Sequence, residues 1–284
     1  MRWVQNLLVV ALLFLNSTVG FGQNQVALGK LKSAALTEVS GIIPYTYAKG
    51  YFWVHNDSGN KNAIYLIDSL ANLKTTVILE GIKAIDWEDI ARYSHNGENY
   101  LLIGDTGNNL RSRDILSFYS IKEPQIDLSI PRLQIPNSDI TEVKVKYADK
   151  KRDVEAFFVD PVDKKVYLIS KRDFRSTVFS FSIDKTNEVH VLKPEMTLPF
   201  NFVTAADISS DGSAILIKNL TNIYFWERKA TESILQTLSK PYRKLNYSVE
   251  PQGEAICFDL NSTNFYTISE RPFGLDAYLY RYDY

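Results

Sequence analysis

Acidic residues stand at the start of short apolar runs at three separate places in the chain. Glu88 lies in DWEDIARY, Glu155 in DVEAFFVD and Glu254 in QGEAICFD. Two further segments share the pattern, VSGIIPY at Ser40 and TAADISSD at Ala206, with a hydroxyl and a methyl group in place of the carboxylate. Carboxylate and hydroxyl oxygens suit a hard cation, and Ca²⁺ tolerates irregular ligand cages better than Mg²⁺. Ser40, Glu88, Glu155 and Glu254 are therefore candidate ligands of one Ca²⁺, provided that the fold brings them together.

A second set of polar and charged residues follows the next apolar run of each segment. The candidate substrate-binding residues in this set are Asp57, Asp105, Arg111, Lys171, Arg172, Lys218 and Arg271. The cations among them suit an anionic ligand such as a phosphate ester, bridged by the metal and held by forked arginine contacts. Beside Glu88, the carboxylates of Asp86 and Asp89 are candidate catalytic groups that could orient an attacking water. Taken one at a time, each of these charges is more simply explained as an exposed loop residue.

These segments belong to a repeated unit of β-strands. Positions 40, 88, 155, 206 and 254 follow one another at steps of 48, 67, 51 and 48 residues, and two further apolar runs follow each position. Alternating apolar and polar residues, with turn signals such as SDG and NDSGN, indicate short antiparallel strands. A β-strand repeat of about 40 to 50 residues is typical of a propeller. The sequence therefore predicts an all-β, five-bladed β-propeller, because a β-sandwich would not explain the repeat.

The two ends of the predicted propeller would complete one another. The last unit stops after its third strand, and residues 25–33 (QVALGKLKS) supply a spare strand that would complete this blade and close the ring. The longest step contains residues 123–140 (EPQIDLSIPRLQIPNSDI), which we interpret as a long loop before an outer strand at residues 142–149. Splitting this unit in two would give the alternative, a six-bladed propeller.

The propeller geometry predicts where the charged residues meet. The first strand of each blade lines the central channel, so the acidic positions would converge at one mouth and the charged loops would surround it. Carboxylates that converge on one axis repel one another unless protons or a cation neutralise them. The alternative to a metal site is a ring of acidic residues that faces a water-filled channel.

Residues 1–22 are predicted to be a secretory signal peptide, which leaves residues 23–284 as the propeller domain. Arg2 precedes an apolar run from Trp3 to Leu15, and small residues follow at the expected cleavage point. The alternative is a membrane anchor, but the apolar run is shorter than the ~20 residues that a span needs. We therefore expect a secreted or periplasmic protein with no membrane insertion after cleavage.

The composition argues against several classes of partner and site. A formal net charge of −1 provides no basic footprint for nucleic acid. Cys257 is the only cysteine, so no intramolecular disulfide can form, and the three histidines are scattered and give no zinc pattern. The chain has no P-loop, dinucleotide-binding or nucleophile-elbow motif. We expect a monomer.

The pattern as a whole resembles the calcium-activated apyrases, which are five-bladed secreted nucleotidases with an axial Ca²⁺. The ring of Ser40, Glu88, Glu155 and Glu254 carries the resemblance, together with VEAFFVD followed by YLISKRD, and ILIKN. The family has a serine at the fourth ring position, and Ala206 departs from it. The chain is also similar to the broader group of exported phytase-like propellers. The resemblance implies a bound Ca²⁺ and, as an expectation, nucleotide hydrolysis.

We therefore expect a secreted Ca²⁺-dependent hydrolase that acts on a small phosphorylated or anionic substrate at the channel mouth. Lys171, Arg172, Lys218 and Arg271 would stabilise the developing negative charge. The alternative is a non-catalytic exported propeller that binds a surface glycan, peptide or protein and holds Ca²⁺ for structural reasons. In that case aromatic residues near the loops, such as Tyr51 and Trp53, would matter more than the cations.

Overall fold

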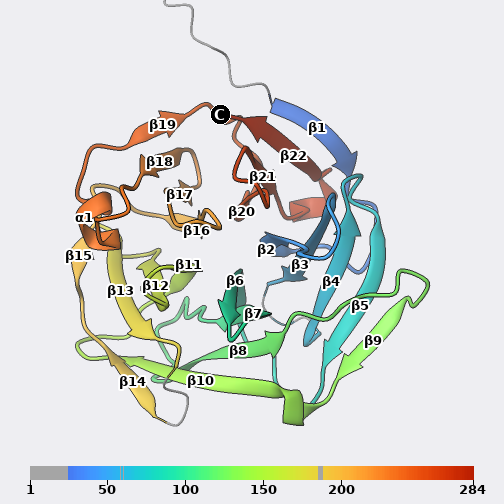
Figure 1. Ribbon diagram of the computed structural model, residues 1–284, viewed down its shortest axis with the longest axis horizontal. Helices are drawn as coiled ribbons and strands as arrows, with labels where there is room; N and C mark the ends of the chain where they lie inside the picture. Colours follow the sequence, from blue (N-terminus) through green and yellow to red (C-terminus); the bar gives the residue numbers. More distant parts are fainter. Residues whose placement is uncertain (1–24, 58, 60, 185–187) are drawn as a thin grey trace, which may run out of the picture.

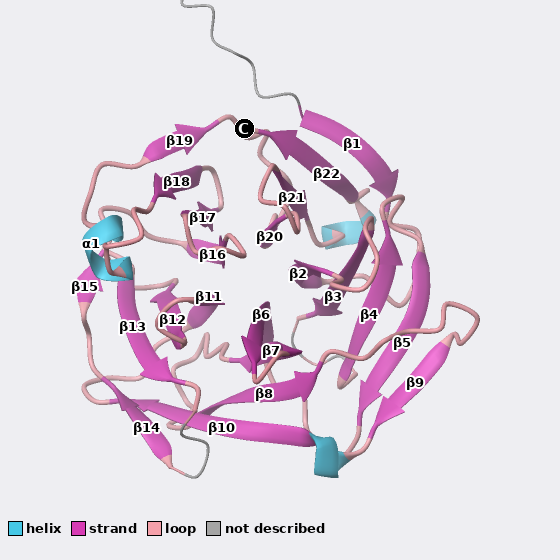
Figure 2. Cartoon of the chain, viewed as in Figure 1, coloured by secondary structure: helices cyan, strands magenta, loops and turns pink. Residues whose placement is uncertain are grey.

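Five β-sheets stand around a central axis like the blades of a propeller (Figure 1). The computed structural model describes residues 25–57, 59, 61–184 and 188–284, and nearly all its regular structure is strand (Figure 2). The predicted all-β, five-bladed propeller is therefore confirmed, and the six-bladed alternative is wrong. The predicted signal peptide lies outside the described residues. Within the part of the chain that is described, no helix is long and apolar enough to cross a membrane.

Each blade runs outward from the axis. The inner strands are β2 (Val39–Pro44), β6 (Trp87–His95), β11 (Val154–Val159), β16 (Val203–Ile208) and β20 (Ala255–Phe258). The second strands are β3 (Tyr51–Asn56), β7 (Glu98–Asp105), β12 (Lys165–Ser170), β17 (Ala214–Asn219) and β21 (Asn264–Ile268). The third strands are β4 (Ala63–Asp68), β8 (Leu116–Lys122), β13 (Thr177–Ser182), β18 (Ile223–Glu227) and β22 (Tyr278–Asp283). The fourth strands are β5 (Leu73–Leu79), β10 (Ile140–Tyr147), β15 (Met196–Thr197), β19 (Arg243–Leu245) and β1 (Gln25–Lys30).

The burial of the side chains on a strand depends on the distance of that strand from the axis. Every residue of β2, β11 and β16 is buried, because neighbouring blades cover both faces of these inner strands. On the outer strand β10, by contrast, Val143 and Val145 are buried while Glu142 and Lys144 are exposed. This alternation is the period of two that a strand with one solvated face requires. The propeller buries a large core without a disulfide, and Cys257 is a free, buried thiol.

The N-terminal strand closes the ring, as predicted from residues 25–33. β1 pairs antiparallel with β22, with Gln25 opposite Tyr282 and Lys30 opposite Tyr278. The inner strands contact one another in the order β2, β6, β11, β16 and β20, and β20 contacts β2 again. The central channel is therefore surrounded on all sides by inner strands.

Two outer edges carry an additional strand, which corrects the prediction of residues 123–140 as a loop. Within that segment β9 (Arg132–Ile135) pairs parallel with β5 of the preceding blade, and the short helix η1 (Asn137–Asp139) follows it. In the same way β14 (Val189–Leu192) pairs parallel with β10 of the preceding blade. Each added strand satisfies backbone groups that an open sheet edge would expose. The remaining helices are α1 (Ile234–Leu238) and η2 (Pro272–Gly274).

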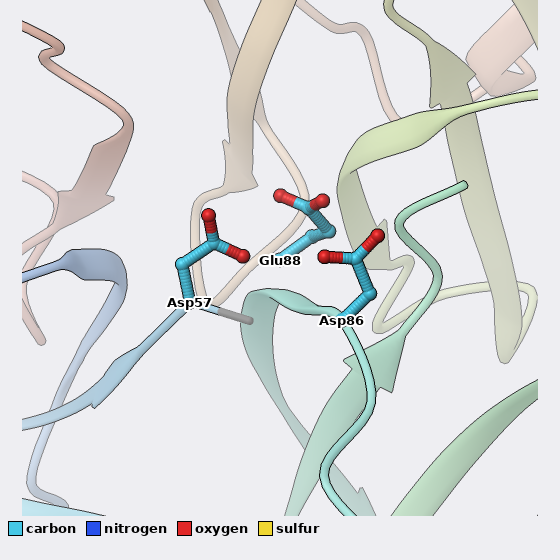
Figure 3. Close-up of side chains that lie close together, drawn as sticks. All are labelled: Asp57, Asp86 and Glu88. Carbon is cyan, nitrogen blue, oxygen red and sulfur yellow. The ribbon is translucent and has the colours of Figure 1, made fainter. Parts of the chain in front are cut away.

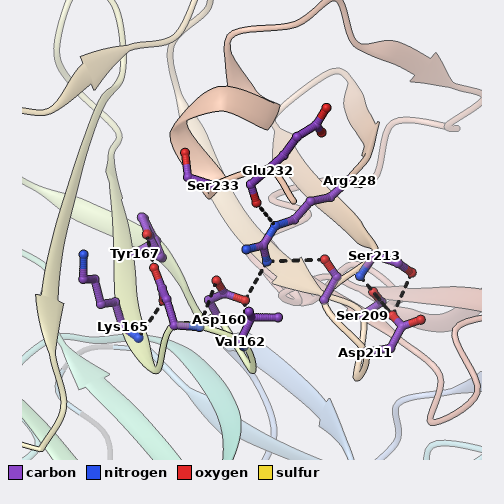
Figure 4. Close-up of polar contacts among 12 residues, drawn as sticks. Asp160, Val162, Lys165, Tyr167, Ser209, Asp211, Ser213, Arg228, Glu232 and Ser233 are labelled. Carbon is purple, nitrogen blue, oxygen red and sulfur yellow. Dashed lines mark hydrogen bonds and ion pairs between the residues drawn. The ribbon is translucent and has the colours of Figure 1, made fainter. Parts of the chain in front are cut away.

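A buried ion pair joins blades three and four (Figure 4). Arg228, which follows β18, donates from Nη1 to Oδ1 of Asp160, which follows β11, over 2.7 Å. Its Nε donates to the carbonyl oxygen of Glu232 over 2.8 Å. Because Arg228 is only 8% exposed and Asp160 is fully buried, the pair fixes the two blades relative to each other.

Candidate functional site

A β-bulge recurs near the start of the inner strand in blades one to four. The pairing with the second strand shifts by one residue at Ser40, Glu88, Glu155 and Thr204. In blade five Glu254 takes the corresponding place, directly before β20. Bulges often occur beside functional sites, because the extra residue re-aims a side chain. These five positions form a ring at one end of the channel, which we call the acidic mouth.

The fourth ring position is Thr204, and its assignment to Ala206 from the sequence is corrected. Ala206 lies two residues further along β16 and packs in the hydrophobic core. The Thr204 hydroxyl donates to the carbonyl oxygen of Gly253 over 3.3 Å, and the Ser40 hydroxyl donates to the carbonyl oxygen of Glu88. Both hydroxyls therefore join one blade to the next at this mouth.

Seven carboxylates gather at the acidic mouth, and we call them the carboxylate cluster. Their oxygens approach within 4.8 Å of one another in three overlapping groups, which are Asp57, Asp86 and Glu88; Asp57, Glu254 and Glu270; and Glu88, Asp153 and Glu155. Figure 3 shows the first group, with the side chains from the end of β3 and the start of β6 turned toward one another. The structure thus brings together Glu88, Glu155, Glu254, Asp57 and Asp86 of the sequence-predicted residues.

Burial and mutual repulsion act on the cluster together. The Glu88 side chain is 2% exposed, and its burial, followed by the charges of Glu155, Asp57 and Asp86, raises its pKa well above the ordinary value. Burial and the neighbouring Glu254 and Asp57 likewise raise the pKa of Glu270 to about 8. A buried carboxylate with a raised pKa is either protonated or neutralised by a cation. Protons or a bound cation would therefore stabilise the carboxylate cluster.

Lys171 supplies one positive charge from within the protein. Its ammonium pairs with Glu155 and lies 3.2 Å from Oε1 of Glu254. Although burial opposes its charge, these two carboxylates raise the pKa of Lys171. Lys171 stands just after the second strand of its blade, as Asp57 and Glu270 do in theirs. Blade three thus places a cation where blades one and five place carboxylates.

The other cations predicted to bind substrate lie in different surroundings. Lys218 is fully buried, donates to the carbonyl oxygen of Gly253, and lies 4.9 Å from the ring centre of Tyr247. Burial lowers the pKa of Lys218 to about 8, although Glu250 and Glu254 oppose the shift. Lys218 is therefore enclosed in blades four and five and does not project from the mouth.

The three arginines lie at the rim. Arg172 pairs with Oδ2 of Asp153 at 2.6 Å, and Arg111 donates from Nη2 to the carbonyl oxygen of Arg172 over 3.1 Å. Arg271 is half-buried and approaches the carbonyl oxygen of Ser33 at 3.5 Å. Arg111 and Arg172 are consequently the predicted cations with the most access to a ligand above the cluster.

Asp105 supports the loop that carries Asp86 and does not join the cluster itself. Its buried carboxylate accepts hydrogen bonds from the backbone N–H groups of Ile85 and Asp86, both over 3.1 Å, and pairs with Arg113 at 2.7 Å. Gly107 donates to the carbonyl oxygen of Asp86 over 3.1 Å. A Cβ atom at Gly107 would overlap the Asp86 and Glu88 carboxylates, so only glycine permits this close approach.

Asp89, the second predicted catalytic group, belongs to the wall of the channel. Its carboxylate accepts from the backbone N–H groups of Ile90, over 2.8 Å, and Phe157, over 3.2 Å. Burial raises its pKa well above the ordinary value. Asp89 therefore connects β6 to β11, whereas Asp86 lies within the carboxylate cluster.

Sequence reasoning missed three cluster or ring residues. Asp153 precedes Glu155 by two positions, as Asp86 precedes Glu88, so the shared Asp-x-Glu pattern was a usable signal. Glu270 was visible only as a loop residue that follows a second strand. Thr204 had no local signal, because the bulge that aligns it with the ring involves pairing with a distant strand.

Neither a family model nor a curated protein matches the sequence. Among solved structures, a luciferin-regenerating enzyme is similar to this chain over 93% of its residues and over 96% of that enzyme. The TM-score is 0.49 and 12% of the aligned residues are identical. Because propellers host many functions, the chemistry of the acidic mouth decides what this one can do.

Proposed function

We propose that the protein is a Ca²⁺-dependent hydrolase of small anionic substrates, with the metal bound at the acidic mouth. The observation that carries this proposal is the group of Asp57, Asp86 and Glu88, whose oxygens lie within 4.8 Å of one another. Among the described residues, no cation forms an ion pair with the buried Glu88. Carboxylates held this closely are neutralised at low cost by a hard divalent cation.

Asp57, Asp86 and Glu88 would hold the ion, which differs from the ring expected from the sequence. Lys171 already neutralises Glu155 and Glu254, and the Ser40 hydroxyl donates to a backbone carbonyl. Because Ca²⁺ takes six to eight oxygen ligands, backbone carbonyls and water would complete the set. The carboxylate-only donor set also argues against a soft metal.

The surrounding residues would bind and activate the substrate. A bound Ca²⁺ would supply Lewis-acid polarisation of a substrate oxygen. Arg111 and Arg172, at the rim, would pair with the anionic group of the substrate and orient it. Glu270 lies beside Asp57 and is largely buried, so its carboxyl group is placed to act as the general acid–base group. In this proposal Glu270 replaces the two acid–base candidates expected from the sequence. Asp86 would bind the metal instead, and the Asp89 carboxylate is hydrogen-bonded to β11.

The proposal is tested by turnover with and without the metal. Nucleotides, phytate and an aryl phosphate are assayed with Ca²⁺ and with chelator, and Ca²⁺ binding is measured by calorimetry. Asp57→Asn should lose Ca²⁺ binding and turnover together, whereas Asp139→Asn, an exposed acid in η1, should change neither. Absence of Ca²⁺ binding, or turnover that persists in chelator, would exclude the proposal.

A second candidate function, a non-catalytic binding module, is favoured by exposed apolar residues around the same mouth. Leu110 is 90% exposed, Phe174 is 90% exposed and Phe273 is fully exposed, each on a loop that follows a second strand. Large exposed apolar side chains that surround one site often mark a surface for a peptide, glycan or protein.

The binding module and the hydrolase make different predictions. Immobilised glycan and peptide panels are probed with wild type, Phe174→Ser and Phe273→Ser, and with Val162→Ser as the control on a hairpin at the other end of blade three. Binding that is lost in both phenylalanine variants but kept in the control, without turnover, favours the module. Turnover unaffected by these variants, without such binding, favours the hydrolase.

A further inference from the structure

The opposite end of the channel contains a cavity of its own. It has a volume of about 440 Å³ and is lined where the inner strands end, by Pro44, Val159, Ile208 and Phe258 among others. All five inner strands contribute, because β6 adds Arg92 to the lining. A cavity of this size falls in the range of small-molecule sites. The carboxylate cluster lies at the other ends of the same strands, so the two sites are separate.

Arg92 is the unusual residue in this cavity. Its half-buried guanidinium makes two long hydrogen bonds, 3.4 Å to the carbonyl oxygen of Pro44 and 3.3 Å to Oγ1 of Thr46. Within residues 25–57, 59, 61–184 and 188–284 it forms no ion pair. The other enclosed arginines do, since Arg152 pairs with Asp149 and Asp173, and Arg228 pairs with Asp160.

An arginine guanidinium has five donors and binds a carboxylate or phosphate through two of them at once. Arg152 and Arg228 use this capacity inside the protein, whereas both hydrogen bonds of Arg92 come from Nη1 and its side chain lines the cavity. Arg92 could therefore form a charge-assisted hydrogen-bonded pair with an anion that enters the cavity.

Besides Arg92, the charged residues of the lining are Asp207, Asp259 and the exposed Lys164, and Asp207 is the most buried of the three. The carboxylate is 7% exposed and accepts a hydrogen bond from the backbone N–H of Phe258 over 2.7 Å. Burial raises the pKa of Asp207 to about 7, and the charge of Arg92 opposes the shift. Ser210 and Asn99 add polar groups to the lining, and Ile43 adds an apolar one. The cavity thus offers two cations, two carboxylates and apolar walls, with Arg92 and Asp207 as its less exposed cation and carboxylate.

We propose that this cavity binds a small organic anion, whose carboxylate or phosphate group pairs with Arg92 and whose hydroxyl or amino group donates to Asp207. The site is independent of the proposed hydrolase, because none of its residues belongs to the acidic mouth. The apolar wall beside the two charged groups favours a compact ligand with a short carbon skeleton over a bare inorganic ion.

The test is calorimetry on the full chain in chelator, which keeps the acidic mouth free of metal. The probes are propionate, lactate, alanine and inorganic phosphate. We expect saturable binding of lactate or alanine, tighter than that of propionate, because only the first two can donate to Asp207. Tightest binding of inorganic phosphate would contradict the proposal, because a bare ion does not use the apolar wall or donate through an organic hydroxyl or amino group. Absence of saturation by all four probes up to about 10 mM overturns the proposal.

Variants identify the partner residue. Arg92→Gln should weaken binding about 10- to 100-fold, the effect of losing a charge-assisted hydrogen-bonded pair. Arg132→Gln, an exposed arginine on β9, is the matched control and should bind like wild type. Ser210→Trp places a bulky group at an exposed part of the lining and should block binding even if Arg92→Gln does not fold. Unchanged affinity in either folded variant overturns the proposal.

Discussion

Replacing Glu88 by glutamine should stabilise the metal-free protein while it abolishes tight Ca²⁺ binding. Two unit charges 4.8 Å apart repel by about 3 kcal/mol at an effective dielectric constant of 20. The cluster relieves part of this repulsion by taking up protons, since the pKa of Glu88 is raised. We therefore expect the Glu88→Gln variant to gain about 1 to 3 kcal/mol of unfolding free energy at pH 8, at roughly 2 to 4 °C of Tm per kcal/mol.

The measurement is thermal unfolding in chelator and in Ca²⁺, at pH 5 and pH 8. Wild type should gain stability from Ca²⁺ and the Glu88→Gln variant should not, because ligand binding to the native state alone raises Tm. In chelator, the increase in Tm of the Glu88→Gln variant over wild type should be smaller at pH 5, where protons already neutralise the wild-type cluster. Glu98→Gln removes an exposed carboxylate at the far end of the same blade and should change neither quantity. A lower metal-free Tm for Glu88→Gln at pH 8, or unchanged Ca²⁺ affinity, would refute the reasoning.

Four further predictions concern the acidic mouth and the closure of the ring. Lys171→Met leaves two buried glutamates without their cation and should cost about 3 to 5 kcal/mol, partly restored by Ca²⁺, as chemical denaturation with and without the metal would show. Gly107→Ala should weaken Ca²⁺ binding measured by calorimetry, because its Cβ would displace Asp86 and Glu88. The metal-free protein should lose stability as pH rises from about 4.5 to about 8, because Glu270 binds its proton more tightly when folded; Tm against pH checks this. Deleting β1 should lower Tm and promote aggregation seen by light scattering, since it exposes the edge of β22.

The repeat made the architecture predictable. Five apolar units at similar steps could be counted without any knowledge of pairing, and residues 25–33 were recognisable as the strand missing from the last unit. Glu88, Glu155 and Glu254 were located on the ring because each begins an inner strand. These features depend on local pattern and on the symmetry of the fold, both of which are present in a single sequence.

Other features depend on pairing between distant segments. Thr204 replaces Ala206 on the ring because a bulge shifts the register between β16 and β17. Lys171 could be assigned to a loop at the mouth, but the loop sequence does not say that its ammonium turns inward to Glu155. The strands β9 and β14 form on edges of other blades, which their own residues do not specify. In each case a partner far along the chain decides the outcome.

The closure of the ring by β1 has a consequence for the order of events during synthesis. β1 leaves the ribosome before every other described strand, whereas its partner β22 is the last of them to be made. Until Tyr278–Asp283 exist, the fifth blade lacks two strands, and the apolar faces between the first and last blades stay open to solvent. Closure is therefore a single late step that joins the most distant parts of the chain, the slowest kind of contact to form. A chain that is halted shortly before that point would expose those faces and aggregate.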